Sequence, residues 1–298
     1  MGMGAGVVLV ALGAGFFGAC GDGFHGDVDA IAPAVKLVDP SVPAPGEASV
    51  DARSEASVDG GTTLPDGGQK SLRLMTYNVK HGERLGLEAV ADVIKRQAPD
   101  LVGLQEVDVE AGRSGGVDQA HRLGQLTGMT SLFRTAFSFA DGGSYGVALL
   151  SRYPVLTSDR VLLPSSGEQR VLATVDVELG PGKILKVGIT HLDLVQASRT
   201  LQVAEVKRVL SAVPRSILFG DMNASPDEAA IVELSGFMQD AWARADSGPG
   251  NTIPVDVPNR RIDYIFLGSG IAKPTFVEVP DERAASDHRP VVAHVPSP

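Results

Sequence analysis

Residues 184–223 read ILKVGITHLDLVQASRTLQVAEVKRVLSAVPRSILFGDMN, and this stretch decides the fold class. One mostly apolar run occupies residues 184–192 and a second occupies residues 216–221. Runs of this kind are typical of β-strands that are covered on both faces. Between them, apolar side chains in residues 196–212 recur at the spacing of one helix face. The stretch therefore predicts a strand, a helix and a second strand, the unit from which layered α/β proteins are built.

Similar patterns continue on both sides of this stretch, from residue 71 onward. Further strand-like runs lie at residues 72–79, 100–107, 146–151, 170–179, 261–267 and 290–295, and a further helix-like segment lies near residues 84–97. Gly180-Pro181-Gly182 is a turn signal between two of the runs, so direct strand-to-strand connections occur beside helical crossovers. Ser225-Pro226-Asp227-Glu228 predicts the start of another helix. We therefore expect α/β layers with mixed sheets.

Polar side chains stand where these apolar runs begin or end. They are Asn78, Glu106, His191, Asp221, Asn223, Asp263, Asp287 and His288. Strand ends open onto loops and clefts, where binding groups accumulate in layered α/β folds. Each residue alone has a structural explanation, since an amide or carboxylate can cap a turn and a histidine can be a hydrogen-bonded interior residue. The combination of carboxylates, amides and two histidines favours a functional site.

The chemistry of this set indicates a metal ion. Carboxylates that are brought together repel and raise one another's pKa unless a cation lies among them. Oxygen ligands suit Mg²⁺ or Mn²⁺, and Mg²⁺ is commonly shared with phosphate oxygens. The only cysteine, Cys20, excludes an internal disulfide and a multi-cysteine zinc site. The sequence therefore predicts phosphoester hydrolysis with Mg²⁺ or Mn²⁺.

The composition limits the partners. The chain of 298 residues has 26 Lys and Arg against 36 Asp and Glu, a formal net charge of −10. This is the wrong sign for a protein held on DNA mainly by phosphate neutralisation. Aromatic residues make up 5% of the chain, so stacking platforms for single-stranded nucleic acid are sparse.

The N-terminal part predicts export. Residues 7–19 (VVLVALGAGFFGA) form an uncharged apolar run that ends at Cys20. The run is shorter than the roughly 20 residues of a membrane-spanning helix but fits the core of a secretory signal. Gly18-Ala19-Cys20 resembles the lipobox of bacterial lipoproteins, in which the cysteine is lipidated. We expect a signal peptide at 1–20 and an exported protein that is anchored through Cys20 to a bacterial envelope membrane, or otherwise is periplasmic or secreted.

Residues 21–70 predict a disordered tether. They are rich in Ala, Pro, Gly, Ser, Asp and Val without a helical or strand period, and they hold three basic and nine acidic residues. Such a segment cannot bury enough apolar surface to offset its conformational entropy. The folded domain is therefore expected at residues 71–298, joined to the anchor by a flexible linker.

The order of the motifs resembles the endonuclease/exonuclease/phosphatase superfamily, which includes deoxyribonucleases, abasic-site exonucleases and sphingomyelinases. The motifs are TYN (76–78), LQEVD (104–108), YGVALLSRYP (145–154), THLD (190–193), GDMNASP (220–226), RIDYIF (261–266) and SDHRPV (286–291). The resemblance covers essentially all of residues 71–298. It implies a four-layer α/β sandwich of two mixed β-sheets flanked by helices.

The resemblance also implies roles for the polar residues. Glu106 is similar to the principal metal ligand, with Asn78 nearby in the phosphate and metal site. Asp221 and Asn223 resemble the groups that orient or deprotonate the attacking water and hold the phosphoryl oxygens.

The two histidines have separate implied roles. His288 is expected to contact the scissile phosphate, and Asp263 to fix the tautomer of His288 and favour its protonated form. The resemblance implies that Asp287 contacts a second metal ion or a bridging water. His191 corresponds to a histidine that protonates the leaving oxygen.

Two arginines and two departures from the family motifs complete the site predictions. Arg113 and Arg170 are candidate phosphate contacts, and each is equally explained as a surface salt-bridge partner. Val147 stands where many family members have an asparagine that could support His191, and Lys80 stands where some relatives have an acidic metal-site residue.

Three functional hypotheses follow. The first is an exported metal-dependent phosphoesterase that acts on phosphodiester or phosphomonoester bonds of a small molecule or lipid headgroup by in-line attack of water. The second is a secreted endo- or exodeoxyribonuclease, which would share the catalytic groups, although no basic stripe accompanies them here. The third is a non-enzymatic surface module, which would not need these polar groups together. No obligate protein partner is evident.

Overall fold

The computed structural model describes residues 71–245 and 248–298, so the predicted signal peptide (1–20) and tether (21–70) lie outside the described residues. Two six-stranded sheets form the domain. The first sheet has the order β11 (Phe276–Glu278), β12 (Val291–Pro296), β1 (Ser71–Asn78), β2 (Leu101–Val109), β4 (Ser144–Ser151), β3 (Thr130–Ser138). The second has the order β5 (Val155–Leu163), β6 (Arg170–Glu178), β7 (Ile184–His191), β8 (Ser216–Asp221), β10 (Asp263–Leu267), β9 (Gln239–Asp240).

Both sheets are mixed, as predicted. β1 pairs with β2 in parallel, and β7 pairs with β8 in parallel, while the other strand pairs are antiparallel. The helices are α1 (Gly86–Gln97), α2 (Gln119–Thr127), α3 (Gln196–Leu210), α4 (Ala229–Ser235) and α5 (Ala241–Ala245), with short 3₁₀ turns η1 (Lys80–Gly82) and η2 (Gly112–Ser114). Among the described residues, no helix is long and apolar enough to cross a membrane.

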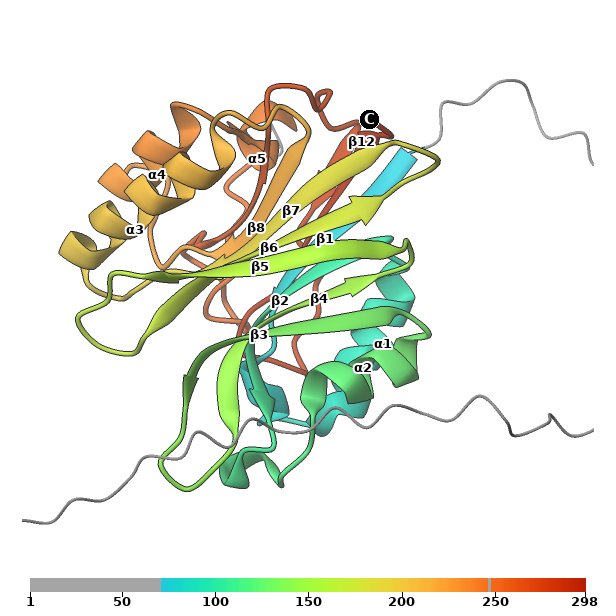
Figure 1. The fold of residues 1–298 in the computed structure, drawn as a ribbon, viewed down its shortest axis with the longest axis vertical. Coiled ribbons are helices and arrows are strands. Elements are labelled where there is room, and N and C mark those ends of the chain that lie inside the picture. The colour runs from blue at the N-terminus through green and yellow to red at the C-terminus, as the bar shows by residue number, and fades with distance from the viewer. Residues whose placement is uncertain (1–70, 246–247) are drawn as a thin grey trace, which may run out of the picture. The chain divides into compact units, whose positions relative to one another are not determined.

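Three apolar clusters define the layers. One cluster lies between the sheets and includes Leu74 of β1 and Phe219 of β8. A second joins α1 and α2 to the first sheet, and a third joins α3 and α4 to the second sheet. Figure 1 shows the two helix pairs on the outer faces of the two sheets. The four-layer α/β sandwich is therefore confirmed, with helix, sheet, sheet and helix in succession.

Strand alternation aims the polar side chains at the space between the sheets. Successive side chains of a strand point to opposite faces. Asp221 shares its face of β8 with Ile217 and Phe219 of the inter-sheet cluster. By the same spacing of two residues, Asn78, His191 and Asp263 share faces with inter-sheet residues of β1, β7 and β10. The strand pattern therefore delivers all four side chains to one layer.

Several features differ from the sequence predictions. The helix expected after an N-cap at Ser225 begins three residues late, since its N-cap is Glu228 and its first residue is Ala229 of α4. The Glu228 side chain instead accepts a hydrogen bond of 2.8 Å from the Ser225 backbone N–H and closes a turn before the helix. Strands β3 and β5 were not predicted, and each forms an edge of its sheet, where many of its side chains are partly or fully exposed.

Candidate active site

Three strands of the second sheet present one polar side chain each in a single row. Asp221 at the end of β8 lies beside His191 at the end of β7 and beside Asp263 at the start of β10, as paired residues of neighbouring strands. Parallel pairing brings the C-terminal ends of β7 and β8 to the same edge of the sheet. Antiparallel pairing brings the N-terminal end of β10 to that edge as well. The row therefore follows directly from the register of the strands.

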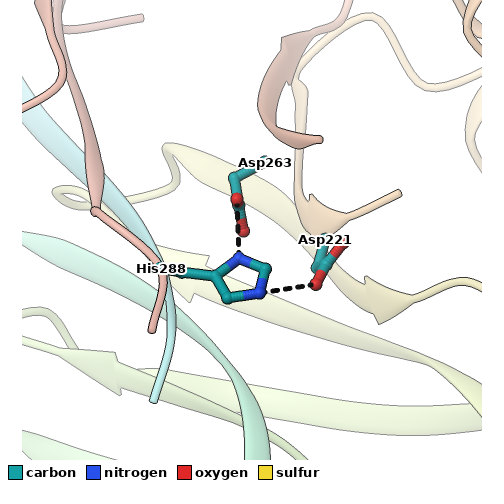
Figure 2. Close-up of side chains that lie close together, drawn as sticks. All are labelled: Asp221, Asp263 and His288. Carbon is teal, nitrogen blue, oxygen red and sulfur yellow. Dashed lines mark hydrogen bonds and ion pairs between the residues drawn. The ribbon is translucent and has the colours of Figure 1, made fainter. Parts of the chain in front are cut away.

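His288, from the loop before β12, lies against this row, as Figure 2 shows. Its Nδ1 lies 2.9 Å from Oδ2 of Asp263, and its Nε2 lies 3.8 Å from Oδ2 of Asp221. Thr252 donates a second hydrogen bond of 2.5 Å to the same Asp263 oxygen. All four side chains are buried. The imidazole is therefore held in one orientation, with Nε2 directed toward Asp221.

The charge of His288 is set by the carboxylates around it. Burial alone would lower its pKa, because an apolar environment disfavours the imidazolium. The charge of Asp263, its hydrogen bond, and the charges of Asp221 and Asp287 outweigh burial and raise the pKa of His288 to about 10. At neutral pH, His288 is an imidazolium that can donate hydrogen bonds from both nitrogens.

A second group joins the two sheets through Asn78. The Nδ2 of Asn78 donates to Glu106 Oε1 at 2.9 Å and to Asp221 Oδ2 at 3.0 Å. The Oδ1 of Asn78 accepts from the Lys80 backbone N–H at 3.0 Å, which fixes the orientation of the amide. Asn78 therefore spaces the two carboxylates and presents its N–H groups to them.

Glu106 reaches this position through a β-bulge. The pairing of β2 with β4 shifts between Leu104 and Val107, and Glu106 adopts a positive φ of 56°. A bulge re-aims a side chain that regular alternation would direct elsewhere. Burial raises the pKa of Glu106; the Asn78 hydrogen bond opposes this shift and the charge of Asp221 adds to it. The half-buried Glu106 carboxylate and the buried Asp221 carboxylate are thus held close together on either side of Asn78.

His191 has a different environment from His288. Its Nδ1 lies 3.3 Å from a guanidinium nitrogen of Arg170 and 3.3 Å from the Tyr145 hydroxyl, and its Nε2 lies 2.9 Å from the Asn223 side-chain amide. Arg170 can only donate and Asn223 Nδ2 is also a donor, so each ring nitrogen faces a donor and the doubly protonated imidazolium is disfavoured. Burial lowers the pKa of His191 to about 3, and the positive charges of Arg170 and His288 act in the same direction, against Asp221. His191 is therefore neutral at physiological pH.

Comparison with known proteins places this site in a family. A sequence model of the Endonuclease/Exonuclease/phosphatase family matches residues 75–288. The chain belongs to this family. Members of the Endonuclease/Exonuclease/phosphatase family hydrolyse phosphoric esters with divalent metal ions, and the protein is accordingly a phosphoric ester hydrolase.

Individual relatives support the family assignment. The chain is 28% identical to the uncharacterized protein YbhP of Escherichia coli (strain K12) over 258 residues, which cover 78% of this chain and 99% of YbhP. It is 28% identical to a 5'-tyrosyl-DNA phosphodiesterase of Caenorhabditis briggsae over 188 residues, which cover 58% of this chain and 50% of that protein.

Solved structures of the Endonuclease/Exonuclease/phosphatase family share the fold. The structure of a family member from Beutenbergia cavernae has a TM-score of 0.65 and 26% identity, over 76% of this chain and 71% of that one. A humanized D. rerio TDP2 has a TM-score of 0.61 over 76% of this chain and 99% of that one; at 20% identity, this likeness concerns the fold alone.

The residues present fit the divalent ion that the family uses. Glu106 and Asp221 supply carboxylate oxygens on either side of Asn78, and such oxygens suit a hard ion such as Mg²⁺. Asp263 Oδ1 is buried and has no hydrogen-bond partner among residues 71–245 and 248–298. Ligand atoms of Asp221, Asp263 and His288 also lie within 4.8 Å of one another. Because His288 Nδ1 and Asp263 Oδ2 are already hydrogen-bonded to each other, however, the pair of Glu106 and Asp221 is the better candidate.

Three predicted residues have other partners. Asp287, expected to contact a second metal ion or a bridging water, forms an ion pair of 3.0 Å with Lys80, and its side chain is 36% exposed. Arg113, expected to contact phosphate, forms two hydrogen bonds of 2.8 Å with the buried Asp108. Arg170 is not a surface residue but lies buried beside His191.

The role predicted for His191, protonation of the leaving oxygen, stays a prediction. The structure places its imidazole in a buried position beside the Arg170 guanidinium. Asn223 lies where it was expected, bound through Nδ2 to the Leu192 carbonyl oxygen and through its backbone N–H to Asp221.

Sequence reasoning missed Tyr145 and Thr252 as parts of the site. Tyr145 begins the YGVALL motif, so its place at the start of a strand was a usable signal. Thr252 lies in a loop without a pattern, and only the fold shows its hydroxyl on Asp263.

Proposed function

We propose that the protein is an exported phosphodiesterase that cleaves its substrate by direct in-line attack of water on phosphorus, with no covalent intermediate. The single observation that carries the proposal is the buried His288, held by Asp263 next to the group of Asn78, Glu106 and Asp221. This arrangement concentrates hydrogen-bond donors and a positive charge where a phosphoryl group would gain negative charge.

The residues have separate tasks in this proposal. His288 donates from Nε2 to a non-bridging oxygen of the phosphoryl group and stabilises the charge that develops there. Asp221, which lies across from that nitrogen, orients the attacking water and accepts its proton. As the new P–O bond forms, the P–O bond to the leaving group breaks, and the leaving oxygen departs as an anion or takes a proton from solvent. Asn223 and Asn78 position Asp221 through its two oxygens.

A metal ion would be held by Glu106 and Asp221, and Mg²⁺ is the proposed ion, with Mn²⁺ the alternative. When bound, the ion would supply Lewis acidity toward a phosphoryl oxygen. His191 acts as a neutral hydrogen-bond partner of the site, and Arg170 provides a buried positive charge beside it.

Charge favours a small or lipid-derived phosphodiester over DNA. Residues 71–298 hold 23 basic and 27 acidic residues, which gives a net charge of −4. DNA-binding proteins gain most of their nonspecific affinity from positive charge. The similarity to tyrosyl-DNA phosphodiesterases keeps a DNA substrate as the second candidate.

A substrate panel tests the proposal. Purified protein with Mg²⁺ or Mn²⁺ is expected to release 4-nitrophenol from bis(4-nitrophenyl) phosphate, with slower hydrolysis of 4-nitrophenyl phosphate and of duplex DNA. The rates should vanish with a chelator and return with added metal. Cleavage of DNA alone, with a steep loss in salt, would replace the proposal by the nuclease hypothesis. No hydrolysis of any phosphoester would refute both.

The export part of the proposal rests on residues 7–19 and Cys20. When the full chain is expressed in a bacterium, we expect it in the membrane fraction, and we expect Cys20→Ala to move it to the soluble fraction. The matched control Gly18→Ala keeps a small residue before the cysteine and should stay with the membrane. Equal amounts of wild type and Cys20→Ala in the soluble fraction would contradict the anchor.

A further inference from the structure

A cavity of about 660 Å³ opens between η1, the start of α1, η2 and α2. Its polar lining includes His81, Glu83, Glu88, Arg113, Gln119 and Arg122. None of the catalytic groups described above lines it. We refer to it as the His81 cavity.

The His81 cavity adjoins the active site through the chain itself and through Gln119. His81 follows Asn78 by three residues, and its carbonyl accepts a hydrogen bond of 2.7 Å from Gln119 Nε2. The Oε1 of the same glutamine accepts from the Asp108 backbone N–H at 2.9 Å, two residues beyond Glu106. One wall of the cavity is therefore fixed to the two strands that carry Asn78 and Glu106.

The charges around the cavity cancel in pairs. Arg113 is bonded to Asp108, Arg122 to Glu88 at 2.8 Å, and Glu83 to Lys80 at 3.2 Å. Burial lowers the pKa of His81, and the charge of Arg113 adds to this effect, so the imidazole is neutral at neutral pH. A second phosphate would therefore meet no unbalanced positive charge here. The lining suits an uncharged group.

The lining offers both donors and acceptors for hydrogen bonds. The guanidinium groups of Arg113 and Arg122 have N–H groups beyond those used in their ion pairs. The carboxylates of Glu83 and Glu88 can accept. His81 Nδ1 is buried and has no hydrogen-bond partner within the described part of the chain. A hydroxyl group both donates and accepts, so a ligand with several hydroxyls can satisfy this mixture.

A nucleobase fits the cavity less well. Of the described residues, no Phe, Tyr or Trp lines it, so a base would find no aromatic ring for stacking. The nearby rings of Phe139 and Tyr145 lie under the Arg113 guanidinium, at 4.7 and 5.4 Å from their centres.

Backbone strain supports a binding role for η1. Lys80 and His81 have φ values of 44° and 42°, in the left-handed region that side chains other than glycine rarely adopt. A strained backbone persists where surrounding contacts hold it in place, and such strain is concentrated at ligand sites. Here it directs the His81 carbonyl to Gln119 and turns the chain around the cavity.

We propose that the His81 cavity binds an uncharged, hydroxyl-rich group, a polyol or sugar, that is esterified to the scissile phosphate. The inference rests on the proposed phosphodiesterase function and names the substrate class for it.

The test compares three chromogenic phosphodiesters. Each carries one 4-nitrophenyl ester group, and the second ester group is myo-inositol, ethyl or thymidine attached through its 5'-oxygen. We expect kcat/KM for the inositol diester to exceed that for the ethyl diester by at least about tenfold, mostly through a lower KM. A few added hydrogen bonds supply an effect of this size. The thymidine diester should resemble the ethyl diester.

A variant that fills the cavity separates binding from general damage. Val117 lines the cavity and is 40% exposed, so Val117→Trp can occupy it without disturbing the core. We expect the inositol-to-ethyl ratio of kcat/KM to fall at least about fivefold, since a few hydrogen bonds are lost. The matched control Leu156→Trp changes an exposed residue of β5 in the other sheet and should keep the ratio.

The outcomes distinguish the two proposals. If no diester is hydrolysed, the proposed function fails and this inference fails with it. If the ethyl diester is hydrolysed but the inositol diester is no better, or the thymidine diester is preferred, only the cavity assignment is overturned. If Val117→Trp leaves the inositol-to-ethyl ratio of kcat/KM unchanged, the cavity assignment is overturned as well.

Discussion

Replacement of His288 by alanine is expected to lower kcat on bis(4-nitrophenyl) phosphate by about 10²- to 10⁴-fold, the range for removal of a positioned catalytic proton donor or charge. The side chain is held by Asp263 with Nε2 turned toward Asp221, and the surrounding carboxylates keep it protonated. Alanine removes both the hydrogen-bond donor and the positive charge. KM should change much less than kcat, because the charge that His288 stabilises grows in the transition state.

A control and a positioning variant accompany this measurement. His121→Ala removes an exposed histidine of α2 and should leave kcat unchanged. Asp263→Asn keeps the size of the side chain that holds His288 but removes its charge, so it should also shift the basic limb of the pH profile to lower pH. Circular dichroism should show all three variants folded. A His288→Ala enzyme that retains kcat within about threefold of wild type would remove His288 from the proposed mechanism, since this change lies below the range above.

Much of the site could be predicted from the sequence because the strands are regular. A side chain that follows an apolar run by an even number of residues stays on the same face of the sheet. Asn78, His191, Asp221 and Asp263 obey this spacing, so their positions at strand ends implied a shared layer. The family resemblance then supplied their chemical grouping. The family and the four-layer fold are both confirmed.

What the sequence could not predict depends on irregular backbone and on contacts between distant segments. Glu106 reaches the site through a bulge, which no periodic pattern encodes. Burial is the largest cause of the lowered pKa of His191, and Arg170, which lies 21 positions earlier in the sequence, adds to it. The edge strand β3 was missed because polar residues interrupt its apolar ones and most of its side chains are only partly buried.

Only the structure explains Lys80, which stands where some relatives have an acidic metal-site residue. Its ammonium group pairs with Asp287 at 3.0 Å and with Glu83 at 3.2 Å. In the sequence, Lys80 stood as an exception to an acidic motif. In the structure, it pairs with Asp287, the carboxylate that the resemblance offered for a second metal ion, and Glu106 and Asp221 remain the candidate pair for a metal ion.

The variant Glu106→Gln is expected to raise the Mg²⁺ concentration needed for half-maximal activity by at least about 100-fold. Even hydrogen-bond partners of a ligand contribute about 10- to 100-fold to metal affinity, and Glu106 would be a ligand itself. Glutamine keeps the size of the side chain but removes one of the two negative charges that flank Asn78. Isothermal titration calorimetry with Mn²⁺ measures the same loss of metal affinity without relying on turnover.

The matched control is Glu110→Gln, because Glu110 has the same φ of 56° but is exposed and belongs to no group of the site. Its metal requirement should equal that of the wild type. Since burial raises the pKa of Glu106, removal of its charge should also leave the fold at least as stable in the absence of metal. Unaltered Mn²⁺ affinity in Glu106→Gln would show that the ion is held elsewhere, and the row of Asp221 and Asp263 would then be the remaining place for it.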